Sequence, residues 1–360
     1  MTTPLLHLIP AAAWRDCLAA GVIAPSVAEF VHLSTADQVA LPAGRLFGGR
    51  PDLLVLALDP DRIGVPVRFE PGLPTDPPDM RFPHAYGPVP TSAVLAVLPY
   101  RPRADGGYDA PVLPVLDAGG RQAAFEPSFL RRAATHEIPV TGGMAVRTDT
   151  VPASRRHNRL LIDGETDAAT VAADAARALG GLPYREIRLL GGHLEATAAA
   201  LGEGDWRVRP LIGMTAPAGG SRDRVEVVDV DALRPVLDAG WRRRLPEAPD
   251  AEIAQLTDRL LVEERVVDLR CLAVRESGVV VASAVLRIDG ATADIDAVET
   301  LPEHRGRAHA HTLLAGARAL AAEAGCDLVV LSADADGRPR HWYTRRGFVE
   351  VNRFWNVSRY

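Results

Sequence analysis

The chain has 360 residues, 40 basic and 46 acidic, so its net charge is −6, and 47% of its residues are hydrophobic. This length suits two or three domains, and the acidic balance argues against a general nucleic-acid-binding surface. No apolar run reaches membrane-spanning length, the N-terminus lacks a secretion signal, and the three cysteines are isolated, so we expect a cytoplasmic protein without a membrane partner.

The first hundred residues have the pattern of one small α+β domain. Apolar runs predict strands at residues 5–9, 30–33, 52–58 and 94–98, and helical periodicity predicts helices at residues 11–20 and 35–46. Residues 101–111 are punctuated by glycine and proline and keep no apolar period, which is typical of a linker. We therefore expect a first domain over residues 1–112.

Three motifs of this domain each contain a histidine. They read Leu6-His7-Leu8-Ile9-Pro10, Phe30-Val31-His32-Leu33-Ser34-Thr35 and Phe82-Pro83-His84-Ala85-Tyr86-Gly87-Pro88. With these motifs the domain resembles a bacterial family of unknown function that is distantly similar to ADP-ribosyltransferases and RNA 2′-phosphotransferases. The resemblance implies binding of NAD or ADP-ribose.

We predict that the three histidines line one pocket, although only the first two lie in predicted strands and the third lies in a loop. Neutral imidazoles and hydroxyls suit a ribose or a phosphate. The alternative is that the histidines are buried structural residues in separate environments. The residues expected at this pocket are His7, His32, Ser34, Thr35, His84 and Tyr86.

Residues 125–216 form a second predicted region. Its strands are expected at residues 142–150, 158–162, 186–190 and 207–214, and its helices at residues 168–179 and 194–201. The Gly191-Gly192 pair before the second helix is interpreted as a turn.

Residues 223–360 form a third predicted region, with a strand at 225–230, helices at 231–241 and 250–261, and strands at 270–276, 278–288 and 292–300. A turn then opens a helix at about 308–324. A buried strand at 327–333, a short helix at 338–346 and a last strand from residue 348 complete the region.

The turn Arg305-Gly306-Arg307-Ala308-His309-Ala310 is the most informative stretch of the chain. It opens a helix, so its backbone N–H groups lack partners and carry the positive end of the helix dipole. Such a turn suits a phosphate or pyrophosphate, and the two arginines add cationic donors.

This turn matches Arg/Gln-x-x-Gly-x-Gly/Ala, and Tyr343-Thr344-Arg345-Arg346-Gly347-Phe348 matches Tyr-x-x-x-Gly-Phe. With these two motifs the third region resembles the GNAT superfamily of N-acetyltransferases. Ala308 departs from the motif by placing a methyl group where backbone approaches phosphate, and Asp336 stands where many members carry Asn. The resemblance implies an α/β (α+β) fold class: a C-terminal GNAT fold with a central mixed sheet, a degenerate GNAT-like middle region and a small N-terminal α+β domain.

The resemblance further implies acetyl-CoA as co-substrate and direct attack by an amine. Tyr343 matches the general-acid tyrosine that protonates the departing thiolate, or it is a packing aromatic beside Trp342 and Phe348. Glu299 and then Asp296 are candidate bases, on opposite faces of a regular strand, unless they are solvated or ion-paired. The residues expected to bind acetyl-CoA are Val298, Thr300, Arg305, Gly306, Arg307, Ala308, His309 and Ala310.

The leading hypothesis is an acyl-CoA-dependent N-acyltransferase acting on a small-molecule or protein amine, with no metal. One alternative is NAD-linked or phosphate-transfer chemistry in the N-terminal domain. Another is a non-catalytic regulatory protein that binds acyl-CoA.

Overall fold

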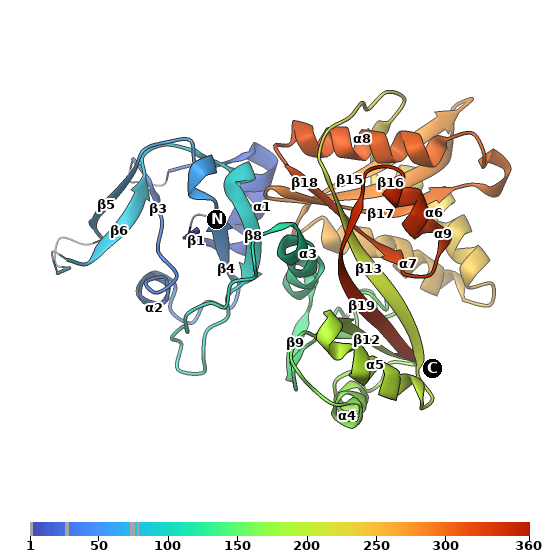
Figure 1. Ribbon diagram of the computed structural model, residues 1–360, viewed down its shortest axis with the longest axis horizontal. Helices are drawn as coiled ribbons and strands as arrows, with labels where there is room; N and C mark the ends of the chain where they lie inside the picture. Colours follow the sequence, from blue (N-terminus) through green and yellow to red (C-terminus); the bar gives the residue numbers. More distant parts are fainter. Residues whose placement is uncertain (1–2, 26–28, 73–75, 78) are drawn as a thin grey trace.

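The computed structural model describes residues 3–25, 29–72, 76–77 and 79–360. Residues 1–2, 26–28, 73–75 and 78 of the first predicted domain lie outside the described residues. Figure 1 shows a small N-terminal unit beside one long, twisted sheet. The predicted fold class is confirmed, with a large mixed sheet and a separate small α+β unit.

The N-terminal unit is built on a three-stranded antiparallel sheet in the order β1-β4-β8, whose central strand is buried along its whole length. A second sheet has the order β3-β6-β5, and β2 pairs with β7. The elements of this unit are β1 (Leu5–Pro10), α1 (Ala11–Ala20), β2 (Val22–Ile23), β3 (Val31–His32), α2 (Ala40–Phe47), β4 (Leu53–Leu58), η1 (Pro60–Arg62), β5 (Val67–Pro71), β6 (Arg81–Ala85), β7 (Val89–Pro90), η2 (Thr91–Ala93) and β8 (Val94–Pro99).

This unit differs from the sequence prediction in several places, and strands β2, β5, β6 and β7 were not predicted. His84 lies in β6 and pairs with His32 of β3, so its placement in a loop was wrong. Helix α2 begins at Ala40 and not at Thr35, because the Thr35 hydroxyl donates to Asp37 Oδ1 at 2.6 Å and closes a local turn.

The linker after β8 is irregular, as predicted, but it packs back onto the N-terminal unit. The Tyr108 hydroxyl donates to the carbonyl oxygens of Arg50 and Phe47, at 2.9 and 3.1 Å. The linker therefore holds a defined position beside the first unit.

Eleven strands form the large sheet of the described residues. In spatial order they are β14 (Glu226–Val228), β15 (Asp268–Glu276), β16 (Val279–Asp289), β17 (Thr292–Thr300), β18 (Leu328–Asp334), β13 (Arg207–Pro217), β19 (Val349–Arg359), β12 (Arg185–Leu190), β11 (Arg159–Ile162), β10 (Gly143–Arg147) and β9 (His136–Val140).

Helices cover both faces of this sheet. One face carries α8 (His309–Glu323), α9 (Arg338–Thr344), α4 (Ala168–Ala178) and α5 (Glu195–Gly202). The other carries α3 (Ala118–Ala133), α6 (Val230–Arg244) and α7 (Asp250–Glu263); the short helices η3 (Gly192–Leu194) and η4 (Pro302–His304) lie in connections. None of the helices in the described part of the chain is both long and apolar enough to cross a membrane.

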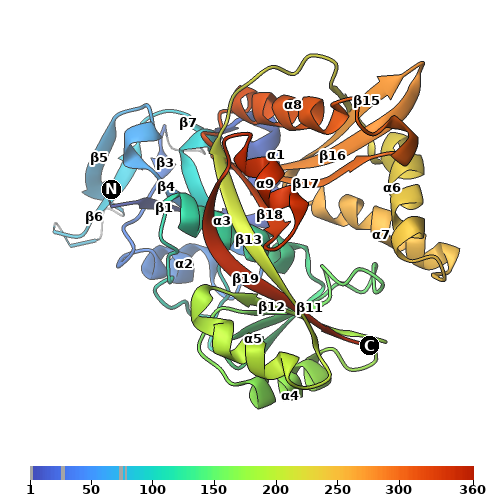
Figure 2. The same cartoon turned by 45° about the vertical axis from the view of Figure 1, so that its right-hand side comes forward.

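The two long strands β13 and β19 exchange places between the halves of the sheet (Figure 2). Strand β13 belongs to the middle region but pairs with β18, and β19 is the last strand of the chain but pairs with β12. The order β9-β10-β11-α4-β12-α5-β13 repeats as β15-β16-β17-α8-β18-α9-β19 along the chain. The middle and C-terminal regions are thus two similar halves that share one sheet.

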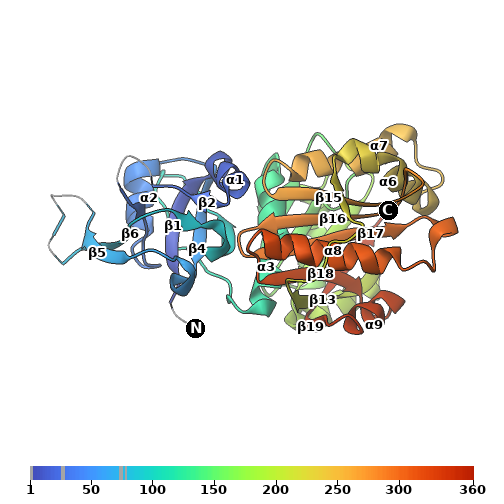
Figure 3. The ribbon, with the colours of Figure 1, turned by 90° about the horizontal axis from the view of Figure 1, so that it is seen from above.

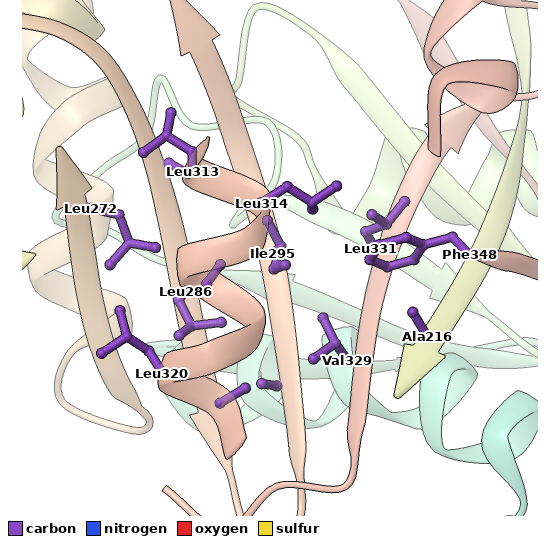
Figure 4. Close-up of a cluster of buried hydrophobic side chains, with 14 of the residues drawn as sticks. Ala216, Leu272, Leu286, Ile295, Leu313, Leu314, Leu320, Val329, Leu331 and Phe348 are labelled. Carbon is purple, nitrogen blue, oxygen red and sulfur yellow. The ribbon is translucent and has the colours of Figure 1, made fainter. Parts of the chain in front are cut away.

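The main core lies under α8. Leu313, Leu314 and Leu320 of this helix pack on Leu286 and Ile295 of the sheet (Figure 4). These side chains are at most 3% exposed, so this core fixes α8 and the turn before it against the strands.

The N-terminal unit is fixed to the C-terminal half by buried polar contacts. The Trp14 indole Nε1 donates to Asp289 Oδ1 at 2.8 Å, and Arg132 of α3 pairs with the same carboxylate. Figure 3 shows α3 between the unit and the sheet. The backbone N–H of Ala291 donates to the carbonyl oxygen of Val94 at 2.7 Å, so the contact includes the backbone of both parts.

Candidate functional site

The turn before α8 has the features of a phosphate-binding loop. Helix α8 begins at His309, and no side chain of the described residues caps its N-terminus. Gly306 has a φ of 81° with open space where a Cβ would stand, and the side chains of Arg305 and Arg307 are 61% and 54% exposed. Free N–H groups, open backbone and two exposed guanidinium groups fit the pyrophosphate of acyl-CoA.

Ala308 adopts the left-handed conformation, with φ 63° and ψ 11°. The glycine of the motif would take this conformation without strain, whereas an L-residue pays about 1–2 kcal/mol. The departure from the motif therefore strains the backbone at this position.

Strand β17, which precedes this turn along the chain, separates from β18. The two strands pair in parallel only from Thr292 to Asp294, and β18 continues along β13 alone. Ala297 has a φ of 52°, and the register with β16 shifts at this point, which marks a β-bulge. The divergence leaves one edge of β17 unpaired with β18. Of the residues predicted to bind here, Val298 packs on the α8 core, and the carbonyl oxygen of Thr300 accepts from Arg305 Nε at 3.2 Å.

The bulge overturns one prediction about the candidate bases. Asp296 lies opposite Val285, and Glu299 lies opposite Ser283, two residues further along β16. Positions two apart on a strand share a face, so both carboxylates point to the side of α6 and α7. The expectation of opposite faces was wrong because the bulge adds a residue between them.

Glu299 is ion-paired. Its carboxylate accepts from Arg243 at 2.8 Å and also contacts Arg244, while Arg305 lies 3.9 Å away. Both oxygens of this carboxylate are therefore already engaged by guanidinium groups.

Tyr343 of α9 packs between Trp342 and Phe348 at ring-centroid distances of 5.0 and 5.7 Å. Burial, followed by the negative charges of Asp296 and Asp294, raises the pKa of the Tyr343 phenol to about 12. The phenol is thus protonated at neutral pH and lies within electrostatic reach of carboxylates on the opposite face of the sheet.

A cavity of about 500 Å³ lies on the α3 side of this opening. Asp294, Val330 and Ser332 line it where β17 and β18 diverge, and residues 112–115 of the linker also border it. This volume is in the range of small-molecule sites. The charged residues lining it are Glu126, Arg131, Arg156, Asp163, Arg188 and Asp294.

The pKa values of the two neighbouring carboxyl groups at the opening, Asp294 and Asp296, are shifted in opposite directions. Burial raises the pKa of Asp294 to about 6; the charges of Arg287 and Arg156 oppose this rise, and that of Asp296 adds to it. For Asp296, burial is outweighed by Arg156 and Arg287, so its pKa lies below the usual range. Asp294 is therefore the carboxyl whose pKa suits a general base near neutral pH.

Arg156, whose charge lowers the pKa of both Asp294 and Asp296, comes from the middle half of the sheet. Arg156 contacts Asp296 and lies 2.9 Å from Glu126 of α3, which also pairs with Arg188 of β12. Sequence reasoning missed this set, as well as Asp294. The available signal was the pattern Asp294-Ile295-Asp296, which places two carboxylates on one face of a buried strand.

The turn of the middle half that corresponds to the phosphate turn is acidic. Asp163, Glu165 and Asp167 precede α4, and Asp167 Oδ1 caps the helix by accepting from the N–H of Thr170 at 2.9 Å. A carboxylate already fills the anion position there, so this half does not suit a phosphate at that turn.

In the N-terminal unit, His7, His32, His84 and Ser34 line one cavity of about 670 Å³. The rings of His32 and His84 are 5.1 Å apart, and Phe30 stacks on His84 at 4.0 Å. Thr35 and Tyr86 are not among the lining residues.

Burial sets the charge state of two histidines in this cavity. Burial lowers the pKa of His7 to about 4, and burial followed by His84 lowers the pKa of His32, so these two rings are neutral at pH 7. Arg45 is the one guanidinium among the described lining residues, and it pairs with Asp76 at 3.0 Å. A phosphate bound here would meet the neutral imidazoles of His7 and His32, the Ser34 hydroxyl and a guanidinium that is already ion-paired.

Comparisons with known proteins agree with both resemblances. The family profile described as protein of unknown function (DUF952) matches residues 8–97, and that of the acetyltransferase (GNAT) family matches residues 231–348. No curated protein is significantly similar to the chain.

Solved structures similar to the chain come from several bacteria. A functionally unknown conserved protein of Staphylococcus epidermidis has 13% identity and a TM-score of 0.51, and the match covers 62% of this chain and 93% of that one. A GCN5-related N-acetyltransferase from Kribbella flavida has 19% identity, a TM-score of 0.46 and coverages of 69% and 96%. Protein CC0527 of Caulobacter crescentus has 26% identity, a TM-score of 0.27 and coverages of 30% and 94%. The first of these matches shows a shared fold.

Proposed function

We propose that the chain, which carries a GNAT acetyltransferase domain at residues 231–348, is an acyl-CoA-dependent N-acyltransferase that transfers an acetyl group to a small-molecule amine. The observation that carries this proposal is the divergence of β17 from β18 after Asp294, directly behind an uncapped helix N-terminus with two exposed arginines. Such an opening accepts an extended arm whose phosphates bind the turn.

In this proposal the residues from Arg305 to Ala310 hold the pyrophosphate through backbone N–H groups and the two guanidinium groups. The unpaired edge of β17 offers backbone groups, including those of Val298 and Thr300, to the pantetheine arm and the acyl carbonyl. Acetyl-CoA, when bound, supplies an acyl group activated as a thioester. The protein has to place this group beside an amine and manage two protons.

Asp294 is proposed as the base. It lines the cavity, and a pKa of about 6 leaves it ionised at neutral pH while it can still accept a proton from a substrate ammonium. Glu299 remains a prediction from the sequence, and it is not among the residues that line this cavity. Tyr343 is proposed to donate its phenolic proton to the departing thiolate.

The cavity favours a small acceptor over a protein terminus. It is bordered by α3 and the linker as well as by the sheet, so a polypeptide would have to displace these segments. Its lining carries both signs of charge, which suits a polar amine.

The test is acetyl-CoA-dependent thiol release with a panel of polar amines, together with calorimetric binding of acetyl-CoA. Ser332→Phe would fill the cavity from an exposed position of β18, and we expect it to raise the acceptor KM and leave acetyl-CoA affinity unchanged. Ser221→Phe, in an exposed loop, is the matched control.

Tight acetyl-CoA binding without turnover on any amine would favour the non-catalytic alternative. CoA phosphates bound away from residues 305–310, or no binding at all, would refute the proposal. The alternative of NAD chemistry in the N-terminal cavity would have to use the neutral imidazoles of His7 and His32 and, among the described residues, the ion-paired Arg45.

A further inference from the structure

Three potential metal ligands meet beside the phosphate turn. Glu276 ends β15, His304 lies in η4, and His309 is the first residue of α8. One ligand atom from each lies within 4.8 Å of the others. His304 Nδ1 is 2.8 Å from Glu276 Oε2, and His309 Nε2 is 3.0 Å from Glu276 Oε1.

His309 is the unusual member of this cluster. It is 3% exposed, and neither of its ring nitrogens makes a hydrogen bond of acceptable geometry with any described residue. A buried imidazole without a hydrogen bond forgoes a stabilising interaction that most buried polar groups have. A metal ion coordinated by Nε2 would give that nitrogen a partner.

We propose that Glu276, His304 and His309 form a binding site for a zinc ion, with water as a further ligand. Two imidazoles and one carboxylate are a ligand set that zinc takes in proteins, whereas magnesium and calcium prefer oxygen ligands. Ligand atoms bound tetrahedrally at zinc distances lie roughly 3.3 Å apart. The observed 2.8 and 3.0 Å, which run to the two different oxygens of Glu276, are a few tenths of an ångström below this value, and any separation that approaches the 4.8 Å limit of the cluster shortens when zinc binds.

Arg307 pairs with the same carboxylate. Its NH1 lies 2.7 Å from Glu276 Oε2, and its side chain is 54% exposed, so it can withdraw into solvent. Zinc and Arg307 therefore compete for one carboxylate. Zinc binding frees the Arg307 guanidinium from Glu276, and the site itself does not depend on the proposed acyltransferase activity.

The test is zinc titration of the chelator-treated full chain by calorimetry, with the visible absorption of bound Co²⁺ as a report on ligand geometry. We expect one zinc per chain. Glu276→Gln and His304→Ala, both at partly exposed positions, should each weaken binding at least about 10-fold. His311→Ala is the matched control, because His311 is an exposed residue of the same helix, and it should bind zinc as the wild type does.

Arg307→Gln should raise the affinity for zinc, in contrast to Glu276→Gln and His304→Ala, because it removes the guanidinium that competes for Glu276. His309→Ala should abolish the Co²⁺ spectrum, and if this buried substitution prevents folding, the two partly exposed variants decide the question. Absence of saturable binding, wild-type affinity in Glu276→Gln and His304→Ala, or zinc affinity of Arg307→Gln no higher than wild type would overturn the assignment.

Discussion

Replacing Asp294 with Asn should stabilise the protein and remove its activity at the same time. Burial raises the pKa of this carboxyl from 3.8 to about 6, so the folded state disfavours its ionised form. About two pKa units at 1.36 kcal/mol each give a penalty on the order of 3 kcal/mol. The folded state binds the proton more tightly than the unfolded state, so this group's contribution to stability is largest below pH 3.8 and is lost as pH rises through about 6.

Asn resembles the protonated carboxyl. At pH 8 the free energy of unfolding of Asp294→Asn should therefore exceed that of the wild type by up to about 3 kcal/mol, and its unfolding temperature should be higher. This gain in stability should shrink toward pH 4. Its turnover should fall roughly 10²–10⁴-fold. The wild-type profile of kcat/KM should rise with pH to a plateau, with a midpoint near pH 6. Asp294→Asn should lack this rise.

Asp296→Asn is the matched control. It removes a carboxylate whose pKa lies below the usual range, so it should destabilise the protein and move the midpoint of activity to lower pH, because Asp296 helps to raise the pKa of Asp294. Thermal unfolding at two pH values and pH–rate profiles measure both effects. An Asp294→Asn variant that keeps wild-type turnover, or is less stable at pH 8, would refute this reasoning. A larger loss in Glu299→Gln would restore Glu299 as the base.

Three further substitutions test other parts of the site and the fold. Ala308→Gly removes the strain of a left-handed alanine, so we expect up to about 1 kcal/mol of added stability in thermal unfolding. The affinity for acetyl-CoA, measured by calorimetry, should be unchanged or higher, and a large loss of affinity would contradict this. Tyr343→Phe should lower kcat roughly 10²–10⁴-fold with little change in acetyl-CoA KM, and unchanged turnover with chemistry rate-limiting would assign the ring to packing alone. Trp14→Phe leaves Asp289 without its indole donor and should lower the free energy of unfolding by about 1.5–3 kcal/mol, with faster proteolysis of the N-terminal unit. Stability equal to that of the wild type would show that this contact does not fix the unit.

The local elements could be predicted from the sequence because their signals are local. Helix α1 occupies residues 11–20 and β17 residues 292–300, as the apolar periods indicate. Helix α3 was missed, since Pro127 and two glycines interrupt a weakly apolar stretch. The exchange of β13 and β19 has no local signal, because both strands bury the same kinds of residues whichever half they complete.

The geometry of the turn before α8 was predictable for a related reason. A helix N-terminus, its glycine and its arginines are adjacent in the chain, so their chemistry is visible in one window of sequence. The acid–base groups differ, because the environment of Asp294 is set by Arg287 on the neighbouring strand and by Arg156 from the other half of the sheet. A single residue in an unusual conformation, Ala297, also moved Glu299 to the face of Asp296.

The strand exchange explains how a half without a phosphate turn can still contribute to the site. Because β13 and β19 join the two halves into one sheet, Arg156 of the middle half reaches Asp296 of the C-terminal half, while Glu126 of α3 takes the other side of its guanidinium. Removing Arg156 would leave three buried carboxylates with one cation fewer, and the pKa of Asp294 would rise further as a result. The proton affinity proposed for catalysis is therefore a property of the paired halves, and a C-terminal half alone, lacking both β13 and Arg156, would not reproduce it.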